Sequence, residues 1–549
     1  MFHPAWRQQA LSVLDQPFDL VILGGGITGC GILLDAAQRG LRALLIERGD
    51  IASGTSSRSS KLIHGGLRYL KQLQFGVTRE SCRERDLQIQ LNPHLVTPQR
   101  WIYPAYRGDK TPAWTVELGL SVYDRLTRGP EKHTRLSHQA LAERVPDLAQ
   151  DNLERGLSYV DARVDDARLT LAVAATAMGY GGTLLTRAEP EEAMRQAGGT
   201  LRGLVVRDLE SGKTHAVEAR LVINAAGVWV DRVRHQLGFD GQHLRPSRGS
   251  HLIFSADRLP LGDAVTCRAP DDQRPVFFIP HPEGVLVGTT DLFHDGGLDD
   301  PRPTAGEVDY LLRATAAAFP SRSLGRDDIV GSFAGLRPVL GHGLDDPSKA
   351  SREEAIWHEE GLLSVAGGKL TTWRAMAEKV VDRTLTLLPA ERSAIAAPCV
   401  TAGTPLVGLA PPDVARRLQR AEAMEPDVAG GIARRLGALG WTACALTDDE
   451  RDLDPLLDDS DLCIAEVRAH LRLGAVLHLS DLLLRRVRVG MWSPAQLAEL
   501  LPRLRKPICE ERGWSFEAWD QEVERLHRAA RGWTLAGVRP EPEGEDPRS

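Results

Sequence analysis

Hydrophobic and polar residues near the start of the chain form blocks that predict a strand, a helix and a second strand. The apolar run at residues 20–23 predicts a buried parallel strand, and residues 27–38 predict a helix that ends at Gly40. A second apolar run at residues 42–46 predicts the next strand. This order of elements predicts an α/β fold built on a parallel sheet.

Three glycines and one acidic residue give this unit its chemistry. Gly24, Gly26 and Gly29 have the G-x-G-x-x-G spacing, and Glu47 follows the second strand. The first glycine makes a tight turn, the second lets backbone approach a pyrophosphate, and the third lets the helix pack closely on the strand. The carboxylate accepts a ribose hydroxyl. The sequence therefore predicts a dinucleotide site, the alternative being a glycine-rich loop of an unrelated α/β protein.

Further along, the pattern changes from parallel to antiparallel. A second α/β block begins near Leu157, and its strand at residues 221–223 ends in the small residues 224–227. Small residues at the end of this strand would let the backbone lie against the adenosine half of a dinucleotide. The alternative is that the strand simply ends in a turn. Between residues 245 and 292, short strands alternate with turns and predict an antiparallel sheet.

The last third of the chain is predicted to be mainly helical. A helix is expected at residues 371–388, before Pro389, and a strongly amphipathic run covers residues 466–488. The tail from Arg539 is rich in proline and charge, so we expect it to be disordered.

The composition fits a soluble protein of about two to four domains, given 549 residues, 42% hydrophobic and 26% charged. The net charge of -7 argues against general nucleic-acid binding. Seven cysteines without a CxxC pair indicate a reducing compartment and no metal cluster. The N-terminus lacks the apolar core of a signal peptide, and the uncharged residues 20–34 are too few to span a membrane. We therefore expect a cytoplasmic protein whose membrane contact, if any, is peripheral.

The polar segment from Thr55 to Tyr69 follows Glu47 closely. Its hydroxyls and paired glycines suit close approach of backbone to a flavin ring and its phosphates, and Arg68 and Tyr69 place a cation and a phenol beyond the ring. A solvated polar loop is the alternative interpretation. Together with the glycine motif, the segment predicts a flavoenzyme.

At this point the sequence resembles a known family, the FAD-dependent glycerol-3-phosphate dehydrogenases of the aerobic, quinone-linked type. Six motifs carry the resemblance in order: SSKLIHGGLRYL at residues 59–70, VDDARL at 164–169, RGSHLIF at 248–254, VLVGTTD at 285–291, GLRPV at 335–339 and GGKLTT at 367–372. It continues more weakly through DLLLRR at 481–486 and GMW at 490–492. Two positions depart from the family pattern, with Ala226 in place of threonine and Trp373 in place of tyrosine.

The resemblance implies a Rossmann-like FAD-binding domain, an antiparallel-sheet substrate (cap) domain and a C-terminal all-helical domain. We expect the FAD-binding domain at residues 1–72, 151–240 and 330–395, and the substrate domain at residues 73–150 and 241–329. The helical domain is expected at residues 396–537, followed by a disordered tail at 538–549. The motifs imply these FAD-binding residues: Gly24, Gly26, Gly29, Glu47, Thr55, Ser56, Ser60, Lys61, Leu62, His64, Gly65, Gly227, Gly368, Leu370 and Thr371.

The substrate that the resemblance implies, sn-glycerol 3-phosphate, carries a dianionic phosphate and therefore needs several cations. Guanidinium groups match phosphate oxygens in pairs. The motifs place Arg68, Arg337, Arg352 and Lys369 near the substrate, with Tyr69 donating a hydrogen bond. For any single arginine the alternative is a surface salt bridge, and Arg352 is the weakest of the four because an ordinary solvated loop surrounds it.

Oxidation of the C2 alcohol needs a group that removes the hydroxyl proton while hydride passes to the flavin. His251 is the expected base, because an imidazole titrates near neutral pH. The alternative is a structural histidine on a strand. Arg337 would also stabilise the developing alkoxide.

The resemblance implies that electrons pass to a membrane quinone, so the protein would bind peripherally to the inner face of the cell membrane. The helix at residues 371–388 alternates apolar and basic residues and would either lie in the bilayer interface or pack on the flavin domain. Two rival functions stay open: an oxidase that delivers electrons to oxygen, and a flavin-binding interaction protein without catalysis. The sequence also leaves open a homodimer.

Overall fold

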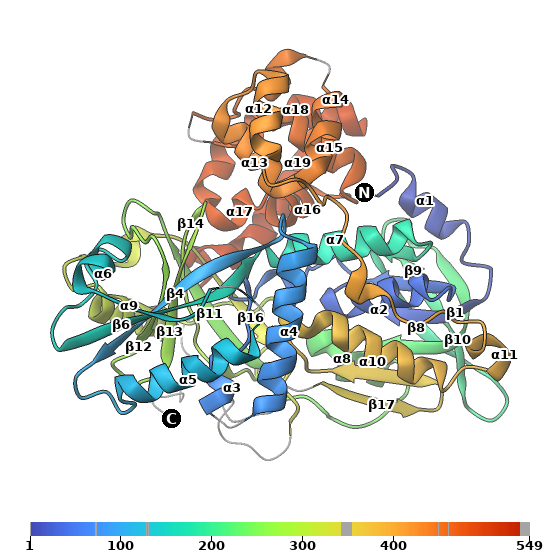
Figure 1. Cartoon of the computed structure of the whole chain (residues 1–549). Helices are drawn as coiled ribbons and strands as arrows, with labels where there is room; N and C mark the ends of the chain where they lie inside the picture. Colours follow the sequence, from blue (N-terminus) through green and yellow to red (C-terminus); the bar gives the residue numbers. More distant parts are fainter. Residues whose placement is uncertain are drawn as a thin grey trace.

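The computed structural model describes residues 2–71, 74–127, 129, 131–341, 354–447, 449–458 and 460–538. Two sheets lie side by side, and a cluster of helices from the last third of the chain sits on top of both (Figure 1). The expected disordered tail falls almost entirely outside the described residues.

The first sheet has the parallel centre that the N-terminal pattern predicts. Its strand order is β17-β18-β10-β1-β2-β7, and the β8–β9 hairpin continues from β10. The pairs β1–β2, β1–β10, β10–β18 and β2–β7 are parallel. The strands are β1 Phe18–Leu23, β2 Ala43–Glu47, β7 Thr183–Thr186, β8 Ala188–Arg195, β9 Leu201–Asp208, β10 Thr214–Asn224, β17 Ala355–Glu359 and β18 Leu362–Ala366.

The second sheet is almost wholly antiparallel, with the order β15-β11-β14-β13-β12-β4-β6-β3, β16 beside β11 and β5 beside β6. Within the described residues one pair departs from this rule, because β4 and β12 run parallel. The strands are β3 Leu62–Ile63, β4 Val96–Tyr106, β5 Thr134–Leu136, β6 Leu153–Val164, β11 Ser247–Phe254, β12 Ala264–Arg268, β13 Pro275–His281, β14 Gly284–Gly288, β15 Leu292–Phe293 and β16 Ile329–Arg337.

Three strands of the second sheet come from ranges that were expected in the FAD-binding domain. They are β3, β6 and β16, which pair with β6, β4 and β11 respectively. The chain therefore crosses between the two sheets more often than the sequence pattern indicates. We propose that these three strands belong to the substrate domain.

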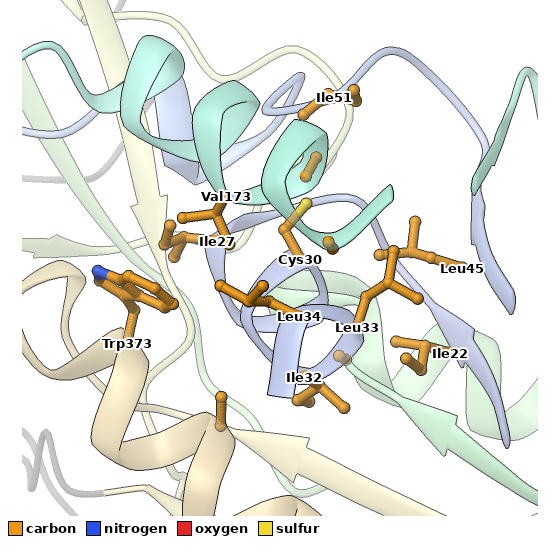
Figure 2. Packing of buried hydrophobic residues seen from close by; sticks show 14 of the residues in the cluster. Ile22, Ile27, Cys30, Ile32, Leu33, Leu34, Leu45, Ile51, Val173 and Trp373 are labelled. Carbon is orange, nitrogen blue, oxygen red and sulfur yellow. The ribbon is translucent and has the colours of Figure 1, made fainter. Parts of the chain in front are cut away.

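Helix α2 (Ile27–Gln38) is the centre of the first domain's core. Its apolar side chains face β1 and β2 on one side and α7 (Asp166–Gly179) and α10 (Trp373–Leu385) on the other (Figure 2). A Cβ added to Gly31 would lie 2.9 Å from the Trp373 ring, so the close α2–α10 packing requires glycine there. Burial of this apolar surface is the main contribution to the stability of the domain.

Helix α10 decides one of the open alternatives. Its apolar residues, including Met376, Val380 and Val381, are buried in the same core. The helix therefore packs on the flavin domain and does not present this stripe to a bilayer. None of the helices in the described ranges is long and apolar enough to cross a membrane.

The two sheet domains contain eight further helices among the described residues. They are α1 Trp6–Leu11, α3 Leu67–Lys71, α4 Phe75–Leu91, α5 Ala113–Leu126, α6 His138–Arg144, α8 Val230–Gln236, α9 Ala305–Ala318 and α11 Ala390–Ser393. Helices α3, α4 and α5 lie together at the front and bottom of the molecule (Figure 1).

The C-terminal region is helical, as predicted. It contains α12 Val414–Glu422, α13 Pro426–Leu436, α14 Gly440–Ala445, α15 Ile464–Leu473, α16 Leu479–Asp481, the π-helical turn η9 Leu482–Arg486, α17 Val489–Trp492, α18 Leu497–Arg512 and α19 Phe516–Ala530. The amphipathic run at residues 466–488 is divided among several short helices, because α15 ends at Leu473 and the chain turns before α16. Asp481 caps the start of α16, because its carboxylate accepts hydrogen bonds from the backbone N–H groups of Leu477 and His478.

All seven cysteines are free thiols. Six of them are buried, and Cys399 is partly buried. Burial raises the pKa of the Cys30, Cys82 and Cys267 thiols, so these side chains behave as small apolar residues.

Candidate active site

A cavity of about 1800 Å³ runs between the two sheets. It opens at the carboxyl ends of the parallel strands β1, β2 and β10, where ligands bind in open α/β sheets. The following predicted residues line it: Gly24, Gly26, Glu47, Thr55, Ser56, Ser60, Leu62, His64, Tyr69, Gly227, Arg337, Gly368, Lys369, Leu370 and Thr371. The fold thus gathers most of the predicted cofactor and substrate residues on one wall.

The glycine loop at one end of this cavity has the shape that a pyrophosphate requires. Gly24 has a φ of +113°, and a Cβ there would lie 2.6 Å from the carbonyl oxygen of Ala225. A Cβ at Gly29 would overlap the carbonyl oxygen of Gly24. At Gly26 the nearest atom to a Cβ is the Ser56 Oγ at 3.3 Å, so this glycine leaves room above the N-terminus of α2 for a ligand.

Glu47 closes the same end of the cavity. Its two carboxylate oxygens accept hydrogen bonds from the backbone N–H groups of Gly25 and Gly49, each at 2.5 Å. Burial raises the pKa of Glu47, and the two backbone hydrogen bonds oppose this effect. The carboxylate therefore holds the glycine loop and the loop after β2 together at the cavity wall.

The hydroxyl-rich segment from Thr55 onward lines the middle of the cavity. The Thr55 hydroxyl donates to the carbonyl of Leu336 at 2.6 Å, and the Ser56 Oγ accepts from the backbone N–H of Ile27 at 2.9 Å. The segment is thereby tied both to β16 and to the N-terminus of α2.

Three of the predicted cofactor residues do not line the cavity. Gly29 lies beneath the glycine loop, where it packs α2 on β1. Gly65 is buried, and its N–H donates to Tyr123 and Asp161, each at 3.0 Å. Lys61 donates from Nζ to Asp166 at 3.0 Å, and burial lowers its pKa to about 8. The Lys61 ammonium is therefore directed away from the cavity.

Arg337, from the end of β16, is held in a fixed position at the second sheet. Its Nη1 lies 3.1 Å from Asp291 Oδ1, and its Nη2 donates to the Thr289 hydroxyl at 3.0 Å. Any side chain at Gly249 on the neighbouring strand would collide with this guanidinium. Gly249, in the motif RGSHLIF, thus leaves the space that Arg337, in the motif GLRPV, occupies.

Lys369 and Tyr69 contact each other at the cavity. The Lys369 ammonium lies 3.7 Å from the centre of the Tyr69 ring, and both residues line the cavity. Of the other two predicted substrate residues, Arg352 lies outside the described residues, and so does the side chain of Arg68.

His251 is buried beside the cavity and does not itself line it. Its Nε2 lies 2.9 Å from the Ser60 hydroxyl, which does line the cavity, and its ring stacks on Phe333. Its Nδ1 has no hydrogen-bond partner among the described residues. Burial, followed by the nearby Arg337 and Lys61 charges, holds the pKa of His251 well below its usual value of 6.5. The imidazole is therefore neutral at neutral pH.

Several residues of the wall were not found from the sequence. Arg268 and Arg274 add two cations, and the guanidinium of Arg268 donates to Tyr103 at 2.8 Å. The sequence shows an aromatic stretch around Trp101 and Tyr103, but nothing in this stretch indicates that β4 lines the cavity. Among the described residues, no group of three or more His, Cys, Asp or Glu side chains could hold a metal ion.

The sequence is similar to those of known proteins. Residues 19–383 match the family model of FAD dependent oxidoreductases, and residues 399–518 match that of the C-terminal domain of alpha-glycerophosphate oxidase. The aerobic glycerol-3-phosphate dehydrogenase of Staphylococcus saprophyticus is 41% identical over 372 residues, which cover 67% of each chain.

Two solved structures are similar as well. The glycerol-3-phosphate dehydrogenase from Bacillus halodurans, complexed with FAD, has 29% identity and a TM-score of 0.79, with 97% of this chain and 98% of that chain covered. The L-alpha-glycerophosphate oxidase of Mycoplasma pneumoniae, with FAD bound, has 20% identity and a TM-score of 0.54, with 68% of this chain and 95% of that chain covered. This second likeness concerns the fold alone.

The fold and the glycine-lined cavity define an FAD-dependent oxidoreductase. The predicted cofactor and the predicted three-part fold are confirmed. The chain belongs to the family of FAD-dependent glycerol-3-phosphate dehydrogenases and oxidases.

Proposed function

We propose that the chain oxidises sn-glycerol 3-phosphate to dihydroxyacetone phosphate and passes the electrons to a membrane quinone. The observation that carries this proposal is a single cavity wall that holds the glycine cradle at one end and the cationic residues Arg337 and Lys369 with Tyr69 elsewhere. FAD, when bound, supplies the hydride acceptor, N5 of its ring system. The names of the similar proteins support the same substrate.

The cationic residues recognise the phosphate of the substrate. Arg337 is fixed by Asp291 and Thr289, so little side-chain entropy is lost when the guanidinium contacts an anion. Lys369 and Tyr69 add an ammonium and a hydroxyl donor. The uncharged substrate glycerol lacks the group that these side chains bind, so it is a poor substrate in this proposal.

Ser60 and His251 remove the proton of the C2 hydroxyl. The Ser60 hydroxyl lies in the wall and contacts His251 Nε2 at 2.9 Å, so it links the buried imidazole to the cavity. The substrate proton moves to the Ser60 oxygen as the proton of Ser60 moves to Nε2. Because the low pKa of His251 keeps its ring neutral, Nε2 is available to accept this proton.

An apolar surface at the mouth of the cavity supports quinone as the acceptor. Trp114 and Leu118 of α5 are 65% and 58% exposed, and Phe75 at the start of α4 is 52% exposed. Leu118 and Phe75 also line the cavity, together with Val116 and Val122. An exposed apolar patch continuous with a redox cavity suits an isoprenoid quinone that approaches from a lipid surface.

Two basic residues that precede α5 in the chain fit the same role. Arg107 and Lys110, in the loop before α5, are exposed and basic. Basic residues next to exposed tryptophan are typical of surfaces that lie on anionic lipid. We therefore propose α5, in place of α10, as the membrane-facing element.

The test is anaerobic reduction of the purified holoenzyme. We expect glycerol 3-phosphate to bleach the visible flavin absorbance, equimolar glycerol to leave it unchanged, and a quinone in lipid vesicles to restore the colour. Rapid recovery of the colour with oxygen, accompanied by peroxide, would identify an oxidase instead. A yellow protein that glycerol 3-phosphate does not bleach would support a flavin-binding protein without this catalysis.

A further inference from the structure

Three arginines of the C-terminal region enter the flavin domain. Arg485 and Arg486 belong to η9, and Arg488 follows it with a φ of +62°. All three are buried, and Arg486 and Arg488 are each only 1% exposed. Among their partners are Asp50, Ser57 and Asp166, which lie about 320 to 440 residues earlier in the chain.

Asp50 is the partner of the first two arginines. Arg486 binds its carboxylate with two hydrogen bonds, Nη1 to Oδ2 at 2.6 Å and Nη2 to Oδ1 at 2.9 Å, and Arg485 Nε contacts the same carboxylate. Gly49 and Ser53, on either side of Asp50, both line the cavity. The two arginines therefore fix the loop that follows Glu47.

Arg488 holds the next part of the cavity wall. Its guanidinium donates to Asp166 at 2.6 Å and to the carbonyl of Ser57 at 2.8 Å. Lys61 contacts the same two groups from the other side. Ser57 ends the 3-10 turn η1 (Thr55–Ser57), whose first two residues line the cavity.

Asp481 forms a third link from the C-terminal region to the wall. It accepts hydrogen bonds from Arg187 at 2.5 Å and from Arg485 at 2.8 Å. Arg187 lines the cavity beside Glu47 and is in the left-handed backbone region, with a φ of +55°. Residues 481–488 thus contact three separate stretches of the chain at the cavity wall: the loop that follows Glu47, the turn that ends at Ser57, and Arg187.

We propose that the C-terminal helical domain is a positioning element of the FAD site, and that Arg485, Arg486 and Arg488 set its shape and charge. They touch neither the substrate nor the cavity itself. Asp50 is a buried carboxylate in the loop after the half-buried Glu47, and Gly49 and Ser53 of this loop line the cavity in which we propose that the pyrophosphate binds. Without its arginines, Asp50 would add an uncompensated negative charge next to a dianionic group.

The experiment titrates apoprotein with FAD and measures the dissociation constant by flavin fluorescence. We expect Arg486→Gln to weaken FAD binding roughly two- to thirty-fold, the range of couplings carried through packed networks. Arg486→Lys keeps the charge and should stay within a few-fold of wild type. Arg416→Gln, an exposed arginine of α12 in the same region, is the matched control and should leave the dissociation constant unchanged.

A double variant separates positioning from simple loss of stability. If charge on Asp50 weakens FAD binding in Arg486→Gln, then Asp50→Asn in that background should recover most of the affinity, although it adds no contact. A lowered melting temperature with unchanged FAD affinity would overturn the proposal, and so would an affinity loss that Asp50→Asn fails to reverse.

If Arg486→Gln does not fold, Arg485→Gln gives the answer, because Asp50 then keeps its pair with Arg486 and Asp481 keeps Arg187. We expect a smaller but measurable loss of FAD affinity from that variant. Wild-type affinity in a folded Arg485→Gln protein would contradict the proposal. None of these measurements depends on which substrate the enzyme oxidises.

Discussion

The two ends of the active-site cavity are built in different ways. At the proposed nucleotide end, the glycine loop offers backbone to the ligand, and much of the lining comes from one stretch of sequence between Gly24 and Ser60. At the proposed substrate end, polar and charged side chains are expected to do the binding, and Tyr69, Arg337 and Lys369 come from three distant segments. The first end depends on the absence of side chains, and the second depends on strand register. Substitutions at the nucleotide end should therefore reduce FAD binding, whereas substitutions at the substrate end should reduce catalysis.

The largest effect is expected at the nucleotide end, from Gly29→Ala. Because a Cβ there overlaps the Gly24 carbonyl, α2 must move away from β1, at a cost of about 1–3 kcal/mol or more in stability and with loss of FAD binding. Thermal melts and bound-flavin absorbance measure both. Gly179→Ala, where a Cβ meets nothing within 4 Å, is the matched control and should behave as wild type.

Gly26→Val should separate the loss of FAD binding from the loss of stability. The nearest atom to a Cβ at this position is the Ser56 Oγ at 3.3 Å, and the pyrophosphate needs the space beyond it. We expect this variant to fold with a near-normal melting temperature and to lose FAD. Retention of a full complement of FAD would remove the basis for placing the pyrophosphate at this glycine.

The next effect lies in the rate of flavin reduction. His251→Asn should lower it roughly 10²- to 10⁴-fold, the range for a positioned acid–base group, with FAD still bound. Ser60→Ala should do the same if the hydroxyl relays the proton. Ser59→Ala is the control, because it removes the Ser59 hydrogen bonds with Asp166 and with the Lys61 N–H and leaves the contact between Ser60 and His251 in place. A normal reduction rate in Ser60→Ala would mean that His251 receives the proton directly.

The pH dependence of this step follows from the lowered pKa of His251. Only the neutral ring accepts a proton, so the rate should rise as pH increases through that pKa and then stay level. Because the pKa lies below 6.5, the rise should fall on the acid side of neutrality in wild type and disappear in His251→Asn. Anaerobic rapid mixing across pH measures it. An unchanged acid limb in the variant would assign the titration to another group.

A smaller effect is expected at the phosphate. Arg337→Ala or Lys369→Ala should each remove a charge-assisted contact of about 1.5–3 kcal/mol, roughly ten- to a hundred-fold in kcat/KM. Arg337→Lys should recover only part, because the two-pronged geometry is lost. FAD affinity should be unchanged in all three. Equal kcat/KM for glycerol and glycerol 3-phosphate in wild type would refute the phosphate site.

The smallest effect is expected at the rim. Leu118→Glu should reduce electron transfer to quinone in vesicles roughly five- to tenfold, since it removes about 1 kcal/mol or more of apolar contact. Transfer to a soluble dye should be unaffected. Leu409→Glu, at an exposed leucine of the C-terminal region, is the control. Equal losses with vesicles and dye would show that α5 affects the cavity and not the membrane contact.

The nucleotide end could be predicted from the sequence because its chemistry is local. Gly24, Gly26 and Gly29 lie on one strand–helix turn, and Glu47 ends the adjacent strand, so spacing alone places them. At the substrate end, the position of the side chains depends on the register in which the strands pair. Arg337 has space only because β16 pairs with β11 so that Gly249 lies beneath it, and no spacing in the sequence indicates that pairing.

Lys61 shows why a residue of a recognisable motif need not line the cavity. It lies inside a recognisable motif, but its side chain pairs with Asp166 and shares that carboxylate with Arg488. Those partners lie 105 and 427 positions away in the sequence. A buried ion pair of this kind depends on how domains pack, which a linear pattern does not record. The same reason hid the contact of Arg486 with Asp50.

The burial of the native thiols has a practical consequence. Because six of the seven cysteines are inaccessible and the exposed surface offers only part of Cys399, a maleimide reagent should label the native protein slowly. A cysteine placed at position 114 would then be the fastest-reacting site on the molecule. An environment-sensitive dye at that position would report, by its colour shift, whether α5 enters lipid when vesicles are added.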